Sequence, residues 1–337
     1  MSKPPKRPID LRRESAFSMT IGGQGDGAAV LNMVATSGSA FVIKQNSVHE
    51  IRLADQIDPE RTNINVPNTQ QLFAEAGSES DIVARTFLSA DALFTKTHFR
   101  DEKVRDRVVL VSAEIMTHLL AAQKVLDHLQ ADQDNQIADI KASNDPTRLP
   151  AVTEVESRAN TFIQKAEHAL QAIYRLVGIF YGPQMKAEGK FPDNLPLAFA
   201  KAFGDNAPST TYAKAVALFG HQVRNARHCV EHRKENQRIV AKDFQLRPDG
   251  KVYPPSIEVV HPRTPLVETD LASFMSDWIE GLTAVTETLL LHLADKNHAP
   301  FGNLPMWVGL VPEDQRRLTK VRVGYLVNFG GKLRRVG

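Results

Sequence analysis

Four stretches of this chain place apolar residues at steps of three and four, and this spacing limits what the chain can fold into. The stretches run over residues 104–129, 155–180, 212–230 and 267–293. Steps of three and four keep side chains on one face of an α-helix, so each stretch predicts a long helix with a single apolar face. Each such face must be buried against another element, so the four helices are expected to pack together.

The remaining sequence predicts shorter elements. Residues 39–54 hold two extended apolar runs around Gln45 and Asn46, which predicts a hairpin. A second hairpin is expected at about 238–260, where two β-rich runs flank the turn sequence RPDG. Together these patterns predict a mainly α fold: an antiparallel array of four or five long helices with an inserted β-hairpin and small β segments near both ends.

The same patterns divide the chain into four parts. Residues 1–28 are basic and rich in proline and glycine, which predicts a flexible arm. Residues 29–100 are expected to form a small α+β region, and residues 301–337 a basic C-terminal tail. Between them, residues 101–300 are expected to form a helical domain that contains the second hairpin.

Composition narrows the classes of protein that the chain can belong to. The 41 basic and 39 acidic residues leave a net charge of +2, which neither requires nor excludes a nucleic-acid partner. Cys229 is the single cysteine, so no intramolecular disulfide and no multi-cysteine metal site can form. No apolar run follows the basic N-terminus, and no stretch approaches the roughly 20 apolar residues that span a bilayer. We therefore expect a cytoplasmic protein with no membrane contact.

The sequence RNARHCVEH at 224–232 places an unusual set of polar groups on the third predicted helix. Two arginines, two histidines, an asparagine and a glutamate lie within about two and a half helical turns. At about 100° per residue, Arg227 and His232 lie roughly 140° apart around the helix axis. They can serve one site only through the reach of arginine, a local distortion of the helix, or a second copy of the chain.

Arg227, His228 and His232 resemble the motif of the HEPN family, in which an arginine is followed by a polar residue, three variable residues and a histidine. The motif lies on a late helix of an antiparallel helical array, as in that family, and this similarity of layout covers about residues 101–296. The resemblance implies a metal-independent endoribonuclease that cleaves RNA as a homodimer and needs no cofactor. Many members of the family are toxins or defence effectors that a second protein, such as an antitoxin, restrains.

The catalytic residues that the resemblance implies, Arg227 and His232, have side chains suited to RNA cleavage. Histidine titrates near neutral pH, so His232 can move a proton to or from the ribose 2′-hydroxyl or the leaving oxygen. Arg227 remains charged and presents a planar fork to the phosphate in the transition state. The expected supporting or phosphate-binding residues are Arg224, Asn225, His228 and Glu231.

Two alternatives use the same segment. His228, Glu231 and His232 also fit HxxEH, the inverted zinc-peptidase pattern, in which two histidines one turn apart bind zinc and the glutamate activates water. That site needs a third ligand, and no later glutamate stands out as one. The other alternative is a non-catalytic helical interaction protein, in which the arginines and the glutamate form ordinary pairs on the helix surface.

The C-terminal tail offers a weaker signal for nucleic acid. It has no acidic residue after Asp314, and its basic side chains could hold a phosphate backbone while Tyr325 and Phe329 stack on a base. The apolar alternation over 321–329 instead predicts a terminal strand, which is the interpretation we favour. The basic residues of the tail are Arg316, Arg317, Lys320, Arg322, Lys332, Arg334 and Arg335.

Overall fold

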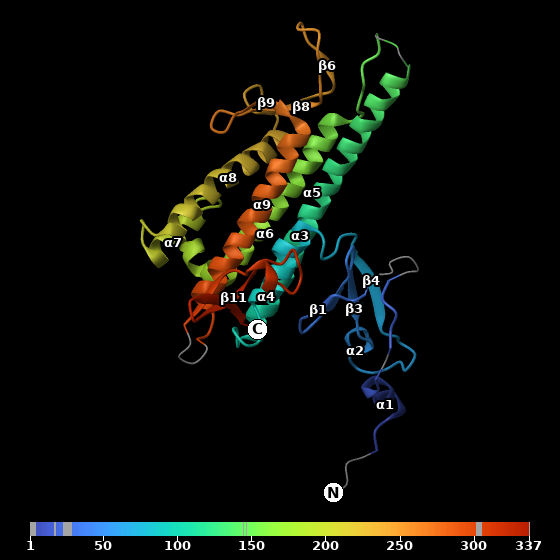
Figure 1. The fold of residues 1–337 in the computed structure, drawn as a ribbon, viewed down its shortest axis with the longest axis vertical. Coiled ribbons are helices and arrows are strands. Elements are labelled where there is room, and N and C mark those ends of the chain that lie inside the picture. The colour runs from blue at the N-terminus through green and yellow to red at the C-terminus, as the bar shows by residue number, and fades with distance from the viewer. Residues whose placement is uncertain are drawn as a thin grey trace.

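The computed structural model describes residues 5–16, 18–22, 29–143, 145, 147–300 and 305–336. Long helices pack side by side in its centre (Figure 1). The antiparallel pair α5 and α6 packs against α9, and α8 covers α6 together with the shorter helix α7. The bounds are α5 (Glu102–Ser143), α6 (Val155–Glu188), α7 (Asn194–Phe203), α8 (Pro208–Glu231) and α9 (Leu271–Asn297).

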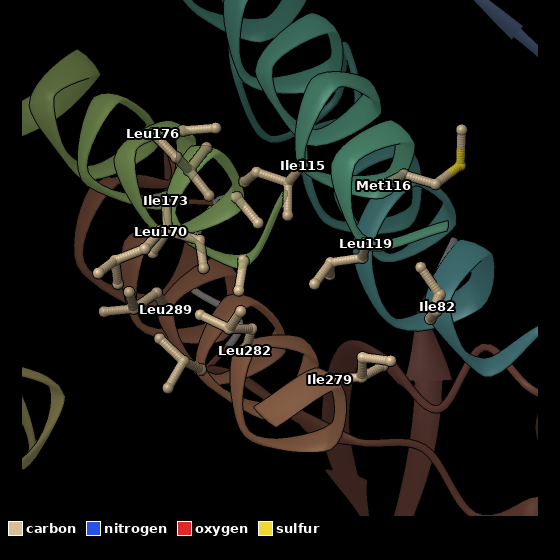
Figure 2. Close-up of a cluster of buried hydrophobic side chains, with 14 of the residues drawn as sticks. Ile82, Ile115, Met116, Leu119, Leu170, Ile173, Leu176, Ile279, Leu282 and Leu289 are labelled. Carbon is tan, nitrogen blue, oxygen red and sulfur yellow. The ribbon is translucent and has the colours of Figure 1, made fainter. Parts of the chain in front are cut away.

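The four apolar stripes lie on α5, α6, α8 and α9, and all four contribute side chains to the core. Figure 2 shows leucine and isoleucine side chains of α5, α6 and α9 directed toward one another, with Ile82 beside them. Full burial of one such side chain stabilises the fold by about 1.5–3 kcal/mol. The buried side chains at this meeting point include Ile115, Leu119, Leu170, Ile173, Leu282 and Leu289.

Helix α5 is the one helix within the described residues that is long and apolar enough, by length and composition, to cross a membrane. The sequence was expected to contain no such stretch. In the structure, 44% of the apolar window is buried inside the protein. Because α6 and α9 pack along α5, the helix has the contacts of a core helix.

The N-terminal region is a four-stranded antiparallel sheet, β1–β2–β3–β4, preceded by α1. The hairpin expected at 39–54 is confirmed, because Ile43 pairs with Val48 across its turn. Part of the expected arm lies outside the described residues, but its described part contains α1, where Asp10 accepts a hydrogen bond from Arg61 at 3.0 Å. The bounds are α1 (Pro8–Glu14), β1 (Asn32–Ala35), β2 (Ala40–Ile43), β3 (Val48–Arg52), α2 (Ala54–Ile57) and β4 (Thr69–Ala74).

A helical segment with a π-helical turn joins this sheet to the bundle, and the remaining strands form three further antiparallel sheets. The sheet β5–β8–β9 lies beside the end of α8, the pair β6–β7 lies beyond it at the upper end of the molecule, and β10–β11–β12 lies beside α4. The bounds are α3 (Asp81–Val83), the π-helix η1 (Ala84–Leu88), α4 (Ser89–Leu93), β5 (Arg238–Lys242), β6 (Gln245–Leu246), β7 (Val252–Tyr253), β8 (Ser256–Val260), β9 (Leu266–Asp270), β10 (Met306–Leu310), the 3-10 helix η2 (Glu313–Gln315), β11 (Val323–Phe329) and β12 (Lys332–Val336).

The expected fold class, a mainly α array of long helices, is wrong. Among the described residues, 51% are helical and 18% lie in strands, and the strands form four separate small antiparallel sheets. Several strands lack a clear period-two apolar pattern, because they are short and largely exposed. Strand β4 has the sequence TQQLFA and β12 the sequence KLRRV, so only pairing with a neighbour identifies them as strands.

Candidate functional site

The motif residues lie at the C-terminal end of α8, next to the sheet β5–β8–β9 (Figure 1). Val223, Ala226 and Cys229 are buried and hold this end of the helix against the core. The helix ends at His232, whose backbone leaves the helical conformation while its N–H still donates to the carbonyl oxygen of His228 at 2.8 Å. The motif therefore occupies the last turn and the cap of the helix.

Arg227 and His232, the expected catalytic pair, are not in contact within one chain. Arg227 forms an ion pair with Glu231, Nη2 to Oε1 2.5 Å, and its side chain is 18% exposed. Its Nη1 is buried and has no hydrogen-bond partner among the described residues. His232 is exposed at the end of the helix, and its ring lies against that of His228, with centroids 6.0 Å apart. The structure thus brings the two histidines together, and pairs the arginine with the glutamate.

Arg224 and Asn225, expected to support the catalytic pair, both make contacts that hold α8 in place. Arg224 donates through Nη1 to the carbonyl oxygen of Phe191, and its guanidinium lies 5.8 Å from the centre of that ring. Asn225 donates through Nδ2 to the hydroxyl of Thr264 at 3.1 Å. Both side chains are half-buried, so a phosphate would have to compete with these partners.

His261, which the sequence patterns did not single out, lies close to the motif. It follows β8, and its Nδ1 accepts hydrogen bonds from the backbone N–H groups of Arg263 at 3.2 Å and Thr264 at 3.3 Å. In the neutral ring the proton must therefore lie on Nε2. Burial lowers the pKa of His261, and the charges of Arg263 and His228 lower it further. Only the tertiary pairing of β8 with β5 and β9 brings this histidine to the end of α8.

The lone cysteine of the segment has no reactive character. Cys229 is buried, and its thiol lies 3.6 Å from the carbonyl oxygen of Val260. Burial raises the pKa of the Cys229 thiol to about 11. The thiol is consequently protonated at neutral pH, and the nucleophilic thiolate is scarce.

The zinc alternative requires a third ligand beside His228 and His232. Across the part of the chain that the structure describes, no group of three or more His, Cys, Asp or Glu side chains lies close enough together to hold a metal ion. Glu231, the glutamate that would activate water, is instead paired with Arg227. The HxxEH spacing therefore has no ligand set to complete it.

Comparison of the chain with models of protein families, with curated proteins and with solved structures gives no match. The resemblance to the HEPN family rests on the motif residues alone. The chemistry available at the end of α8 is that of three neighbouring imidazoles, His228, His232 and His261, and one half-buried guanidinium that is paired with a carboxylate. The imidazoles can transfer protons, and the guanidinium can bind a phosphate.

Proposed function

We propose that the chain is a metal-independent endoribonuclease of HEPN type that acts in the cytoplasm as a homodimer. The observation that carries the proposal is the Arg227–His232 motif at the accessible end of α8, with His228 and His261 beside it. Arg227 and His232 are separated within one chain, so the proposed site needs a second copy. Two motif helices across a two-fold axis would supply both groups to one phosphate.

The proposed reaction needs no group beyond the protein and RNA. The ribose 2′-oxygen attacks the adjacent phosphorus, and the bond from phosphorus to the 5′-oxygen breaks, which leaves a 2′,3′-cyclic phosphate and a 5′-hydroxyl. His232 of one copy takes the proton from the 2′-hydroxyl, and the second His232 gives a proton to the leaving oxygen. Arg227 exchanges Glu231 for the phosphate and stabilises the charge that develops there. A second protein that covers this end of α8 would restrain the enzyme.

Cleavage of RNA in excess chelator tests this function. We expect the wild type to produce cyclic-phosphate ends, and Arg227→Ala and His232→Ala each to lower the rate by roughly 10²–10⁴-fold, as loss of a positioned acid, base or charge does. His221→Ala is the matched control for histidine, since His221 lies on the same helix but pairs with Asp193. Arg233→Ala is the control for arginine, because Arg233 is exposed and pairs with Glu156. Equal cleavage by wild type and both motif variants would contradict the proposal.

A non-catalytic interaction protein is the second candidate, and the contacts of the arginines favour it. Arg227 is already neutralised by Glu231, and Arg224 and Asn225 hold the helix to its neighbours. In that case the polar end of α8 is a docking surface and the motif residues are structural. The same assay separates the two candidates: the absence of cleavage at any concentration at which the wild type is dimeric supports the interaction protein.

A further inference from the structure

A cavity of about 590 Å³ lies at the other end of the molecule from the motif. It is lined by β1 and the residue before it, α4 and the loop after it, the first turn of α5, the loop before β11, and the strands β11 and β12. Figure 1 shows two of the lining elements, α4 and β11, at the lower end of the bundle, whereas α8 runs up toward β8 and β9. A cavity of this size is in the range that small organic ligands occupy.

Cationic side chains dominate the polar lining of the cavity. Among the described residues that line it, Asp91 is the one carboxylate, and the cations are Lys96, Arg105, Arg317 and Arg335. Arg105 is neutralised by its neighbours on α5, Glu102 at 3.0 Å and Asp106 at 3.3 Å. The guanidinium groups of Arg317 and Arg335 have no hydrogen bond or ion pair with any described residue. These two guanidinium groups therefore lack a counter-ion among the described residues, and the exposed Lys96 is a third unpaired cation on the cavity.

Arg335 is the cation on the cavity whose surroundings are least favourable for its charge. Its Nη1 is buried without a hydrogen-bond partner among the described residues. Burial lowers the pKa of Arg335, and the nearby charge of Arg317 lowers it further. A half-buried guanidinium without a counter-ion is unfavourable, and an anion placed between the two arginines would reduce the repulsion and accept the unmet hydrogen bond of Arg335 Nη1.

The remaining wall suits the body of an organic ligand. His98 is 3% exposed and stacks on Tyr325, with ring centroids 3.6 Å apart and planes at 23°. The Tyr325 hydroxyl donates to the carbonyl oxygen of Leu93 at 2.9 Å, which fixes this pair of rings. Phe94 is buried as well, so the apolar surface open to a ligand comes from Leu31, which is 44% exposed, and half-buried Leu318. A free inorganic anion would leave this surface unused.

Polar groups complete the lining. Thr95 Oγ1 and His98 Nδ1 are buried without hydrogen-bond partners among the described residues. Asp91 accepts one hydrogen bond, from Asn32 at 3.3 Å, through Oδ2, so its Oδ1 remains an acceptor for a hydroxyl or amino group. Phosphate, hydroxyl groups and a flat apolar body occur together in a nucleotide.

We propose that this cavity binds a mononucleotide, with its phosphate between Arg317 and Arg335, its ribose beside Asp91 and its base against the apolar side chains of Leu31 and Leu318. The proposal does not rest on the ribonuclease function, because the cavity and the end of α8 share no residue. Binding is measured without RNA, so failure of one proposal leaves the other standing.

Calorimetric titration of the full chain with AMP, GMP, CMP and UMP tests the site, with adenosine and inorganic phosphate as partial ligands. We expect at least one nucleotide to bind, and Arg317→Gln and Arg335→Gln each to weaken its binding by roughly ten-fold to hundred-fold, as loss of a hydrogen bond to a charged group does. Arg334→Gln is the matched control, since Arg334 is exposed, is the neighbour of Arg335 on β12 and does not line the cavity. Adenosine and phosphate should each bind more weakly than the nucleotide.

Several results would overturn the proposal. The first is that none of the four nucleotides binds the wild type, whether or not a short RNA binds. Others are equal affinity of Arg317→Gln and the wild type, or phosphate that binds as tightly as the nucleotide. Thermal unfolding guards against misfolded variants, and because Arg317 is exposed and makes no hydrogen bond, Arg317→Gln alone suffices if Arg335→Gln does not fold.

Discussion

At the scale of single residues, burial and contacts determine the charge pairing and reactivity of the motif side chains, which their spacing in the sequence does not reveal. Arg227 and His232 match a catalytic pattern, yet the arginine is half-buried against Glu231 while the histidine is exposed to water. Cys229 lies between two histidines in the sequence, and burial removes its reactivity. The helical wheel predicted the angular gap between Arg227 and His232, but the ion pair of Arg227 required coordinates.

His292 provides a prediction at this scale. Its ring contacts the rings of Phe199 and Phe203, with centroid distances of 4.9 Å and 5.1 Å. Its Nε2 is buried and has no hydrogen-bond partner among the described residues. Burial, and then the charge of Lys296, lower the pKa of His292 in the folded state. Below pH of about 6.5 the unfolded chain therefore takes up a proton that the folded chain does not, so His292 makes the protein less stable as the pH falls.

Replacing His292 with phenylalanine keeps an aromatic ring and removes this proton uptake. We expect the free energy of unfolding of His292→Phe to fall less than that of the wild type between pH 7.5 and pH 5.5. Urea denaturation at the two pH values measures the difference. Identical losses in the two proteins would show that His292 does not contribute.

At the scale of elements, one buried carboxylate connects three segments that lie far apart in the chain. Glu287 of α9 accepts hydrogen bonds from Arg85 of η1 at 3.1 Å and from Arg322, just before β11, at 2.8 Å. The Glu287 side chain is 6% exposed. These contacts fix the π-helical segment and the C-terminal sheet against the bundle, and the sequence patterns identified neither Arg85 nor Glu287 and gave Arg322 only as a basic residue of the tail.

We expect Glu287→Ala to lower the free energy of unfolding by about 3 kcal/mol, because removing one member of a buried pair leaves uncompensated charge. Glu280→Ala is the matched control on the same helix. Glu280 also binds Arg85, at 2.7 Å, but its side chain is 64% exposed, so its loss should cost under about 1 kcal/mol. Chemical denaturation of both variants checks the prediction, and similar losses from the two substitutions would contradict it.

At the scale of the whole molecule, the proposed ribonuclease depends on how two copies meet. Leu218 is 68% exposed on α8 and lies seven residues before Asn225, about 20° away around the helix axis. An exposed leucine on the motif helix offers an apolar contact for a partner copy. We expect the two copies to pair through this face, on which His232 lies about 40° from Leu218. Arg227 lies about 180° from Leu218, so its side chain would have to reach the shared phosphate around the end of the helix.

Leu218→Glu should therefore shift the protein toward the monomer and lower RNA cleavage in parallel, since a glutamate pair across a two-fold axis repels. Leu310→Glu serves as the control, because Leu310 is comparably exposed on β10 at the far end of the molecule. Sedimentation measures the oligomeric state of each variant. A dimeric and fully active Leu218→Glu protein would exclude pairing through this face.

The sequence by itself determined the four long helices and the N-terminal hairpin, because their apolar periodicity is local and runs over many residues. It also placed the motif on the third of these helices. Only the tertiary structure decided the fold class, since short strands such as β4 and β12 are defined by hydrogen bonds to partners rather than by their own residues. The partners of Arg227, the approach of His261 and the cavity between Arg317 and Arg335 were likewise decided there, because each depends on contacts between segments distant in the chain.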